Sequence, residues 1–292
     1  MLISTLKLVE LFCQLDDFCI AFEKNIAPHL LPGPGSAHSA NRPAISVSEM
    51  MCIEIVYHLS GHKCFEYYYR SEVLEGNLRS YFPKAPSYNR FVELKPRMLT
   101  ALVCYLQLYG MGRMLGLYYA DSTTLTVCRS QRINSHKVFK GKAERGKSSM
   151  GWFYGFKLFI VINGFGELAN AFITKGNVAD NNGSIMQRLF RKLRGLAFAD
   201  KGFINAKAAE DLLAGGLRLI TKVRKNMKNQ FIEIGHKMLL MKRGVIESVN
   251  DILKTVCDID HSRHRSPMNM LVNTYAALIA YSTLDRKPSI YI

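Results

Sequence analysis

The chain has 292 residues, of which 48% are hydrophobic and 21% are charged, a composition typical of a globular protein that excludes a largely disordered chain. Its 39 Lys and Arg residues outnumber 23 Asp and Glu residues, so the formal net charge is +16. Lys and Arg side chains release condensed counterions when they bind phosphates. The excess of positive charge therefore favours a polyanionic partner, with nucleic acid as the first candidate and an anionic membrane surface as the second.

Cysteine usage and the N-terminal segment indicate the compartment. The seven cysteines are scattered and contain no C-x-x-C pair, which argues against a disulfide framework and for a reducing environment. Residues 1–18 lack the basic leader and cleavage site of a signal peptide. The most apolar stretch, residues 270–284, is shorter than a membrane span and is interpreted as a core helix. We therefore expect a cytoplasmic protein.

The first 110 residues are predicted to be helical. One helix is expected up to about residue 30, followed by a connection rich in Pro, Gly and Ser at 31–43. The sequence "SVSE" at 46–49 is typical of a capping box in which Ser46 and Glu49 satisfy each other's backbone amides. Further helices are predicted over 64–82 and 97–109, with Pro96 at the boundary of the last. These helices form a candidate helix-turn-helix with Arg90, Lys95 and Arg97 as phosphate contacts.

The pattern changes to strands after residue 114. Strands are predicted at 114–121, 155–163, 166–174, 195–200 and 217–223, and "NGFG" at 163–166 is typical of a hairpin loop. Helices are predicted at 180–193 and 205–216, followed by two closing helices. A hairpin followed by alternating helices and strands predicts a mixed α/β fold, in which helices pack on a mixed central sheet.

Two of these apolar strands are predicted to end in an acid, Asp121 and Asp200. Ligands bind outside the carboxyl ends of parallel strands, so two carboxylates converge there if the strands are neighbours. Carboxylate sites without His or Cys suit Mg²⁺ or Mn²⁺, and a metal-bridged pair is a common device for cleaving phosphodiesters. The alternative for each aspartate is a residue that caps the loop or helix that follows.

A third acid lies in a predicted amphipathic helix at 241–256. Its apolar residues form one stripe, while Arg243, Glu247 and Lys254 share a different face at about 100° per residue. This arrangement places one carboxylate and two cations on a single line. The alternative is an ordinary solvated helix face with an Arg/Glu pair four residues apart.

Two basic segments are candidate DNA-backbone contacts. Residues 129–147 carry seven Lys or Arg residues against one acid, and a second basic stretch begins at 222. The candidate contacts are Arg129, Arg132, Lys137, Lys140, Lys142, Lys222, Arg224 and Lys225. The alternative is that these segments are merely solvated loops. The aromatics of "GWFYGF" at 151–156 are candidates for stacking on an extruded base, although aromatics that open a strand are more often core.

Asp121, Asp200 and Glu247, with the spacing R-x₃-E-x₆-K from Arg243 to Lys254, together resemble the DDE transposases of bacterial insertion sequences. The spacing is part of the signature of the insertion-sequence group four, although Leu240 occupies the position of that signature's Tyr. The chain is most similar to the insertion-sequence family nine-eight-two, whose landmarks resemble "SYNRFVEL", "GNVADN", "FADKGF" and "LITKVRKNMK" in this order. One departure is Phe159, where that family is expected to carry His.

The resemblance implies a domain organisation and a chemistry. It implies a helical region at 1–110 that binds transposon ends and an RNase H-like catalytic domain at 111–292. It also implies two Mg²⁺ or Mn²⁺ ions held by the three acids, and attack of a freed 3′-OH on target DNA after hydrolysis at the ends of the element. The implied partners are the double-stranded terminal inverted repeats and target DNA, bound by a homodimer or larger assembly in the bacterial cytoplasm, at the nucleoid. The alternatives are a nuclease without strand transfer and a catalytically inactive DNA-binding derivative.

Overall fold

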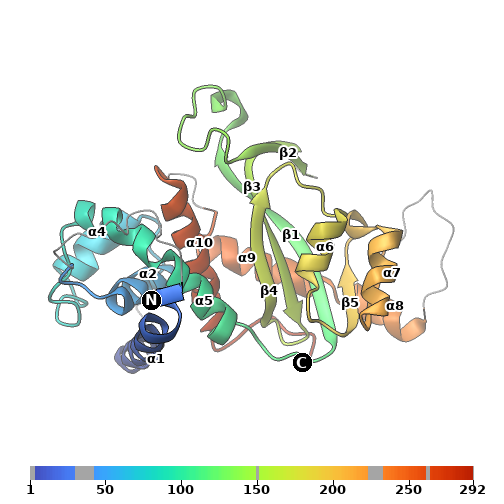
Figure 1. The fold of residues 1–292 in the computed structure, drawn as a ribbon, viewed down its shortest axis with the longest axis horizontal. Coiled ribbons are helices and arrows are strands. Elements are labelled where there is room, and N and C mark those ends of the chain that lie inside the picture. The colour runs from blue at the N-terminus through green and yellow to red at the C-terminus, as the bar shows by residue number, and fades with distance from the viewer. Residues whose placement is uncertain (1–3, 30–42, 149–150, 223–232, 261–263, 292) are drawn as a thin grey trace. The chain divides into compact units, whose positions relative to one another are not determined.

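The computed structural model describes residues 4–29, 43–148, 151–222, 233–260 and 264–291 (Figure 1). The chain divides into two compact units. The helical unit comprises residues 1–110, 253–259 and 264–283, and the sheet unit comprises 111–252, 260–263 and 284–292. Within the described ranges, no helix combines the length and the apolar character that crossing a membrane requires.

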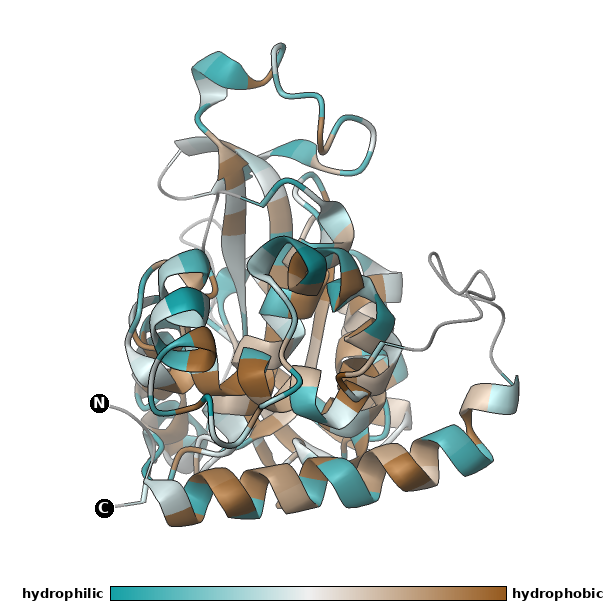
Figure 2. Cartoon of the chain, turned by 90° about the vertical axis from the view of Figure 1, so that its left-hand side faces the viewer, coloured by the Kyte–Doolittle hydropathy of each residue, from teal (hydrophilic) through white to brown (hydrophobic). Residues whose placement is uncertain are grey.

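The helical unit is organised around one nearly all-buried helix, α2 (Val47–Ser60). A helix that is apolar on every side belongs inside a core, and α2 packs against both α1 and α10. In contrast, α1 is amphipathic. Hydrophobic and hydrophilic bands alternate along this long helix near the N-terminus in Figure 2. The helices of this unit are α1 (Thr5–Asn25), η1 (Ala27–His29), α2, α3 (Phe65–Tyr68), η2 (Tyr69–Leu74), α4 (Tyr88–Leu94), η3 (Lys95–Met98), α5 (Leu99–Tyr109) and α10 (Pro267–Ser282).

Local sequence signals set the starts of these helices. The capping box predicted at the start of α2 is confirmed, because Ser46 accepts from the Glu49 amide while the Glu49 carboxylate accepts from the Ser46 amide. At the start of α10 the Ser266 hydroxyl accepts from the Asn269 backbone amide, and Pro267 occupies the first turn. The single helix predicted over 64–82 is wrong, because the helical segment ends at Leu74. Gly76 then passes so close to the Ser71 carbonyl that a side chain would not fit.

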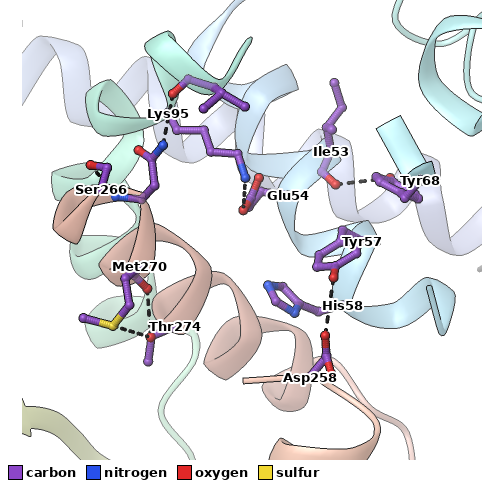
Figure 3. Close-up of polar contacts among 12 residues, drawn as sticks. Ile53, Glu54, Tyr57, His58, Tyr68, Lys95, Asp258, Ser266, Met270 and Thr274 are labelled. Atoms are coloured by element: carbon purple, nitrogen blue, oxygen red, sulfur yellow. Dashed lines mark hydrogen bonds and ion pairs between the residues drawn. The ribbon is translucent and has the colours of Figure 1, made fainter. Parts of the chain in front are cut away.

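A buried ion pair lies inside the helical unit (Figure 3). The Lys95 ammonium donates to the Glu54 carboxylate at 2.8 Å, and both side chains are almost completely buried. The ammonium also lies 3.4 Å from the centre of the Phe65 ring. The expectation that Lys95 contacts DNA phosphates is therefore wrong, because its charge is already paired inside the core. Arg90 and Arg97 are exposed.

The sheet unit contains one mixed six-stranded sheet. Its strands are β1 (Leu117–Cys128), β2 (Glu144–Ser148), β3 (Gly151–Asn163), β4 (Leu168–Lys175), β5 (Gly195–Ala199) and β6 (Leu217–Thr221). β3 pairs antiparallel with β1 on one side and with β4 and β2 on the other, whereas β1, β5 and β6 run parallel. The strand order is therefore β4 and β2, then β3, β1, β5 and β6. This confirms the mixed α/β class expected for an RNase H-like domain.

Helices cover the sheet on both faces. The helices of the sheet unit are η4 (Ser130–Arg132), α6 (Gly183–Leu189), η5 (Lys201–Phe203), α7 (Ala206–Ala214), α8 (Ile234–Met241) and most of α9 (Gly244–Thr255). Tyr118, Ala120 and Phe159 form one core with residues of α6 and α7. Tyr119 alternates to the opposite face, where its hydroxyl donates to the Leu239 carbonyl of α8 at 3.2 Å.

Several predicted boundaries differ from the structure. β1 continues to Cys128 because its antiparallel pairing with β3 extends well beyond Asp121. β2 was not predicted, since its polar sequence lacks an apolar alternation. In the described part of the chain after β6, three helices (α8, α9 and α10) are present instead of the predicted two. The "NGFG" hairpin does connect β3 to β4, and Gly166 adopts the positive φ of 74° that favours glycine.

The first boundary between the two units follows residue 110. The predicted boundary between the helical region and the catalytic domain lies at the same position. The C-terminal part is distributed differently from that division. Residues 253–259 and 264–283 group with the helical unit, because α10 packs against α2 and α5.

Candidate functional site

The strand register places Asp121 and Asp200 side by side. Ala120 of β1 pairs with Ala199 of the parallel strand β5, so the next residue of each chain segment is an aspartate. Asp200 follows the last residue of β5 and begins η5. Asp121, by contrast, lies within β1, so the prediction that it ends its strand is wrong. The expected convergence still occurs, because β5 ends where β1 carries its acid.

Asp121 faces helix α9 and is largely withdrawn from solvent. The Asn250 side-chain amide of α9 donates to the Asp121 carboxylate at 3.0 Å. Burial, together with the smaller effect of the negative charges of Asp180 and Asp200, raises the pKa of Asp121 to about 6. The Ser122 backbone amide and the Arg243 guanidinium oppose this pKa shift. The Asp121 carboxylate therefore lies near the negative charges of Asp180 and Asp200, an arrangement expected where a cation binds.

The pKa of Asp121 predicts a pH dependence of folding stability in the absence of divalent metal. Between 3.8 and about 6 the folded state binds more protons than the unfolded state, so the free energy of unfolding falls as pH rises. Asp121→Asn removes this dependence. We expect the variant to match the wild type near pH 4 and to exceed it by up to about 3 kcal/mol at neutral pH. Urea unfolding in EDTA, followed by fluorescence of Trp152, the single tryptophan, measures this difference. Equal stability of both proteins at neutral pH would contradict it.

Glu247 lies on α9 one turn before Asn250, on the side of the helix that approaches Asp121. Its carboxylate accepts from Arg243 at 2.7 Å and is 61% exposed, whereas the Arg243 side chain is 12% exposed. Arg243 itself precedes the first residue of α9, so the prediction that it belongs to this helix is wrong. Its buried Nε atom has no hydrogen-bond partner among the described residues. Arg243 therefore retains a donor beside the acids.

Lys254 lies on α9 seven residues after Glu247, which corresponds to about two helical turns. The division between the two units falls within α9, between Ile252 and Leu253. Lys254 is grouped with the helical unit, whereas Glu247 and Arg243 are grouped with the sheet unit. The pairing of Arg243 with Glu247 is also what the alternative of an ordinary solvated helix face predicts.

Asp180, for which no role is predicted from the sequence, belongs to the same acidic surrounding. Asp180 accepts from Ser122 of β1 at 2.9 Å and from the Lys157 ammonium of β3 at 2.9 Å. It precedes α6 in the segment "GNVADN", which was recognised as a landmark of the resembled family without a chemical role. Lys157 is buried beside it, and this pair ties β3 to the loop after β4.

The donor set suits a hard divalent cation. Asp121, Asp200 and Glu247 offer only carboxylate oxygens, and the buried Oδ1 atom of Asn250 has no hydrogen-bond partner among the described residues. The three acids are not arranged as a complete metal-binding site, however. Within the described ranges, no three His, Cys, Asp or Glu side chains lie close enough together to hold an ion. The Glu247 carboxylate is instead paired with Arg243 through its Oε1 atom.

The predicted DNA contacts fall on two edges of the sheet. Arg129, Arg132, Lys137, Lys140 and Lys142 are all exposed on the connection between β1 and β2, which projects beyond the sheet in Figure 1. Lys222 is exposed immediately after β6, on the opposite edge strand. Arg224 and Lys225 lie outside the described residues. The structure therefore gathers the first five cations on one loop and separates them from Lys222.

The fold and the site define a class: a mixed α/β protein with one acid within β1, one directly after the neighbouring parallel strand β5, and one on helix α9, which contacts Asp121 through Asn250. Residues 111–267 match the family described as "Transposase DDE domain", and the chain belongs to this family. Members of this family generally depend on a divalent metal. The match covers the sheet unit except for residues 284–292, and it contains all three predicted acids.

Comparison with solved structures gives a distant likeness. The piggyBac transposase, solved as a synaptic complex with hairpin DNA, is 13% identical, with a TM-score of 0.42. The aligned region covers 96% of this chain and 65% of that chain, so this chain spans about two thirds of the length of that transposase. No curated protein gives a match.

Proposed function

We propose that the chain is a DNA transposase that hydrolyses a phosphodiester at the ends of a mobile element and joins the freed 3′-OH to target DNA. The observation that carries this proposal is the register of β1 and β5, which sets Asp121 beside Asp200 at the edge that α9 approaches through Asn250. Membership of the transposase DDE family supports it. The proposed element is an insertion sequence of the family nine-eight-two type, acting in a bacterial cytoplasm.

The proposed metal ligands are Asp121, Asp200 and Glu247, and the proposed ions are two Mg²⁺ or Mn²⁺. Bound ions of this kind supply an activated water or hydroxyl and stabilise the leaving oxygen. The chain's own residues prepare this site. Asn250 orients Asp121, and the mutual repulsion of Asp121, Asp180 and Asp200 favours cation binding at their edge of the sheet.

Two cations are proposed to act on the substrate phosphate. Release of Glu247 frees the guanidinium of Arg243, whose Nε donor already has no hydrogen-bond partner among the described residues. A guanidinium binds phosphate oxygens in a bidentate manner, so Arg243 is suited to hold the phosphodiester beside the acids. Lys254 is proposed as a second phosphate contact on the resemblance alone.

The test combines cleavage and joining in one assay. Duplexes that carry the inverted repeats flanking the gene are incubated with the full chain, Mg²⁺ and a supercoiled target plasmid. We expect nicking at the repeat boundary and covalent joining to the plasmid. Cleavage without joining would identify a nuclease, and binding without cleavage would identify an inactive DNA-binding derivative.

The exposed cations of the β1–β2 connection are proposed to grip the DNA backbone. Each neutralised phosphate contributes about −0.9 to the slope of log K against log salt. The triple replacement of Lys137, Lys140 and Lys142 by Ala is expected to flatten this slope by about 2.7 in total. Fluorescence anisotropy of labelled duplex DNA at several salt concentrations measures the effect.

A matched control removes three other exposed cations. Arg191, Arg194 and Lys207 lie on the turn before β5 and on α7. The first two precede β5, at the end opposite Asp200. Their replacement by Ala changes the net charge equally and is expected to leave the slope nearly unchanged. An equal effect of both triple variants would show that net charge, and not the β1–β2 connection, governs DNA binding.

A further inference from the structure

The three aromatics that open β3 have different surroundings. Phe153 and Tyr154 are each only 7% exposed, and the Tyr154 hydroxyl donates to the Phe139 carbonyl at 3.2 Å. They belong to the core. Trp152, in contrast, is 57% exposed, which is unusual for the largest apolar side chain. Only Trp152 therefore remains available for an external ligand.

Two cations lie over the Trp152 ring. The Arg145 guanidinium lies 4.9 Å and the Lys147 ammonium 5.7 Å from its centre. Both cations come from β2, where Lys147 is the direct partner of Trp152 across the antiparallel pair. Register thus fixes an aromatic side chain next to two positive charges, and this arrangement rests on backbone pairing.

This group forms one wall of a pocket of about 420 Å³. Ligand pockets typically measure about 300–1,000 Å³. The other walls are Lys157 of β3, the loop 176–181 after β4, and Gly202 after β5. Gly202 keeps the pocket open toward Asp180, because a Cβ atom there would lie 3.2 Å from an Asp180 carboxylate oxygen. The pocket therefore adjoins the acidic site through Asp180 and through the segment that follows Asp200.

The chemistry of the walls selects a ligand class. A planar apolar surface next to Arg145 and Lys147 suits an aromatic base attached to a phosphate. Among the cations that line the pocket, Lys157 is already paired with Asp180, so the phosphate is assigned to Arg145 and Lys147 of β2. Bases inside a duplex present no free face, because each is stacked on its neighbours. An unpaired nucleotide exposes both faces of its base and is therefore the ligand class that these walls favour.

We infer that this pocket holds an unpaired nucleotide of the DNA substrate, stacked on Trp152, next to the phosphodiester that the acidic site processes. The inference rests on the proposed function for the identity of the DNA, but nucleotide binding itself requires neither metal nor cleavage. The pocket would make the enzyme distinguish DNA with unpaired nucleotides from fully paired duplex.

The single tryptophan of the chain provides a direct probe. The full chain in EDTA is titrated with a single-stranded octanucleotide of mixed sequence and, separately, with a blunt duplex of the same sequence. Tryptophan fluorescence reports occupation of the pocket, and anisotropy of labelled DNA gives the affinity. We expect the single strand to quench Trp152 and protect it from iodide, and the blunt duplex to do neither.

Variants separate stacking from general DNA binding. Trp152→Ala is expected to weaken single-strand binding by about 10-fold and to leave duplex binding unchanged, whereas Trp152→Phe retains most of the affinity. The matched control is Phe165→Ala, because Phe165 is also an exposed ring with a cation over it, Arg113 at 5.4 Å, but lies at the far end of β3. It is expected to change neither affinity.

Two results would overturn the inference. One is quenching of Trp152 to the same extent by the duplex and the single strand, and the other is an equal loss of both affinities in Trp152→Ala. Failure of the proposed function gives a different result, namely no Mg²⁺-dependent cleavage of element ends while single-strand quenching persists.

Discussion

Asp121→Asn, Asp200→Asn and Glu247→Gln are each expected to abolish Mg²⁺-dependent cleavage of element ends while DNA binding persists. Each change removes the negative charge of one proposed metal ligand and leaves the shape of the side chain nearly unaltered. A metal ion contributes several kcal/mol to stabilising the transition state, so the rate should fall by about 10³-fold or more. Single-turnover cleavage of labelled ends measures the rate, and anisotropy in EDTA measures DNA binding.

The three variants differ in their secondary effects, which makes the set informative. Asp121→Asn keeps an acceptor for Asn250, whereas Glu247→Gln weakens the ion pair that holds Arg243. The matched control is Glu210→Gln, which changes an exposed acid of α7 in the same unit. It should cleave at the rate of the wild type. Full activity of any one of the three site variants would remove that residue from the proposed metal site.

Lys95→Met is expected to destabilise the helical unit by about 3–5 kcal/mol, because it leaves the Glu54 carboxylate buried without its partner. Burial already raises the pKa of Glu54 and lowers the pKa of Lys95, and each partner opposes the shift of the other. Each of the two charges shown in Figure 3 is therefore stable in this core only while the other is present. Urea unfolding followed by far-ultraviolet circular dichroism, which is dominated by helices, measures the loss.

The chain contains a matched exposed pair for comparison. Arg90 donates to Glu93 at the same distance of 2.8 Å, but both side chains are more than half exposed. Arg90→Met should therefore cost less than about 1 kcal/mol. The double variant Glu54→Leu/Lys95→Met is expected to recover much of the loss of Lys95→Met, since it removes both buried charges. A similar small effect of Lys95→Met and Arg90→Met would show that water reaches the buried pair.

Local sequence patterns predicted which helices and strands form better than they predicted where each one ends. The capping box at Ser46 was readable because it involves residues three apart, and the β3–β4 hairpin was readable from its loop. The extension of β1 beyond Asp121 was not readable, because polar residues such as Ser122 and Thr123 become strand only through pairing with β3. β2 was missed for the same reason.

The residues of the candidate site likewise differ in whether the sequence predicted them. Asp121, Asp200 and Glu247 were visible because apolar segments precede the first two and a helical stripe frames the third. Asp180 and Asn250 gave no such signal, since their importance lies in contacts with residues distant in the sequence, namely Ser122, Lys157 and Asp121. A polar side chain in a loop or on a helix is uninformative until its partner is known.

The sequence by itself determined the mixed α/β class, the excess of positive charge and the acids to be considered, because these depend on composition and on short-range periodicity. Only the tertiary structure decided that Asp121 lies beside Asp200, that Lys95 is sequestered by Glu54, and that Trp152 alone of its aromatic group faces a pocket. Each of these depends on strand register or helix packing between segments far apart in the chain. The physical reason is that burial and pairing change the charge, pKa and accessibility of a side chain without any change in its local sequence.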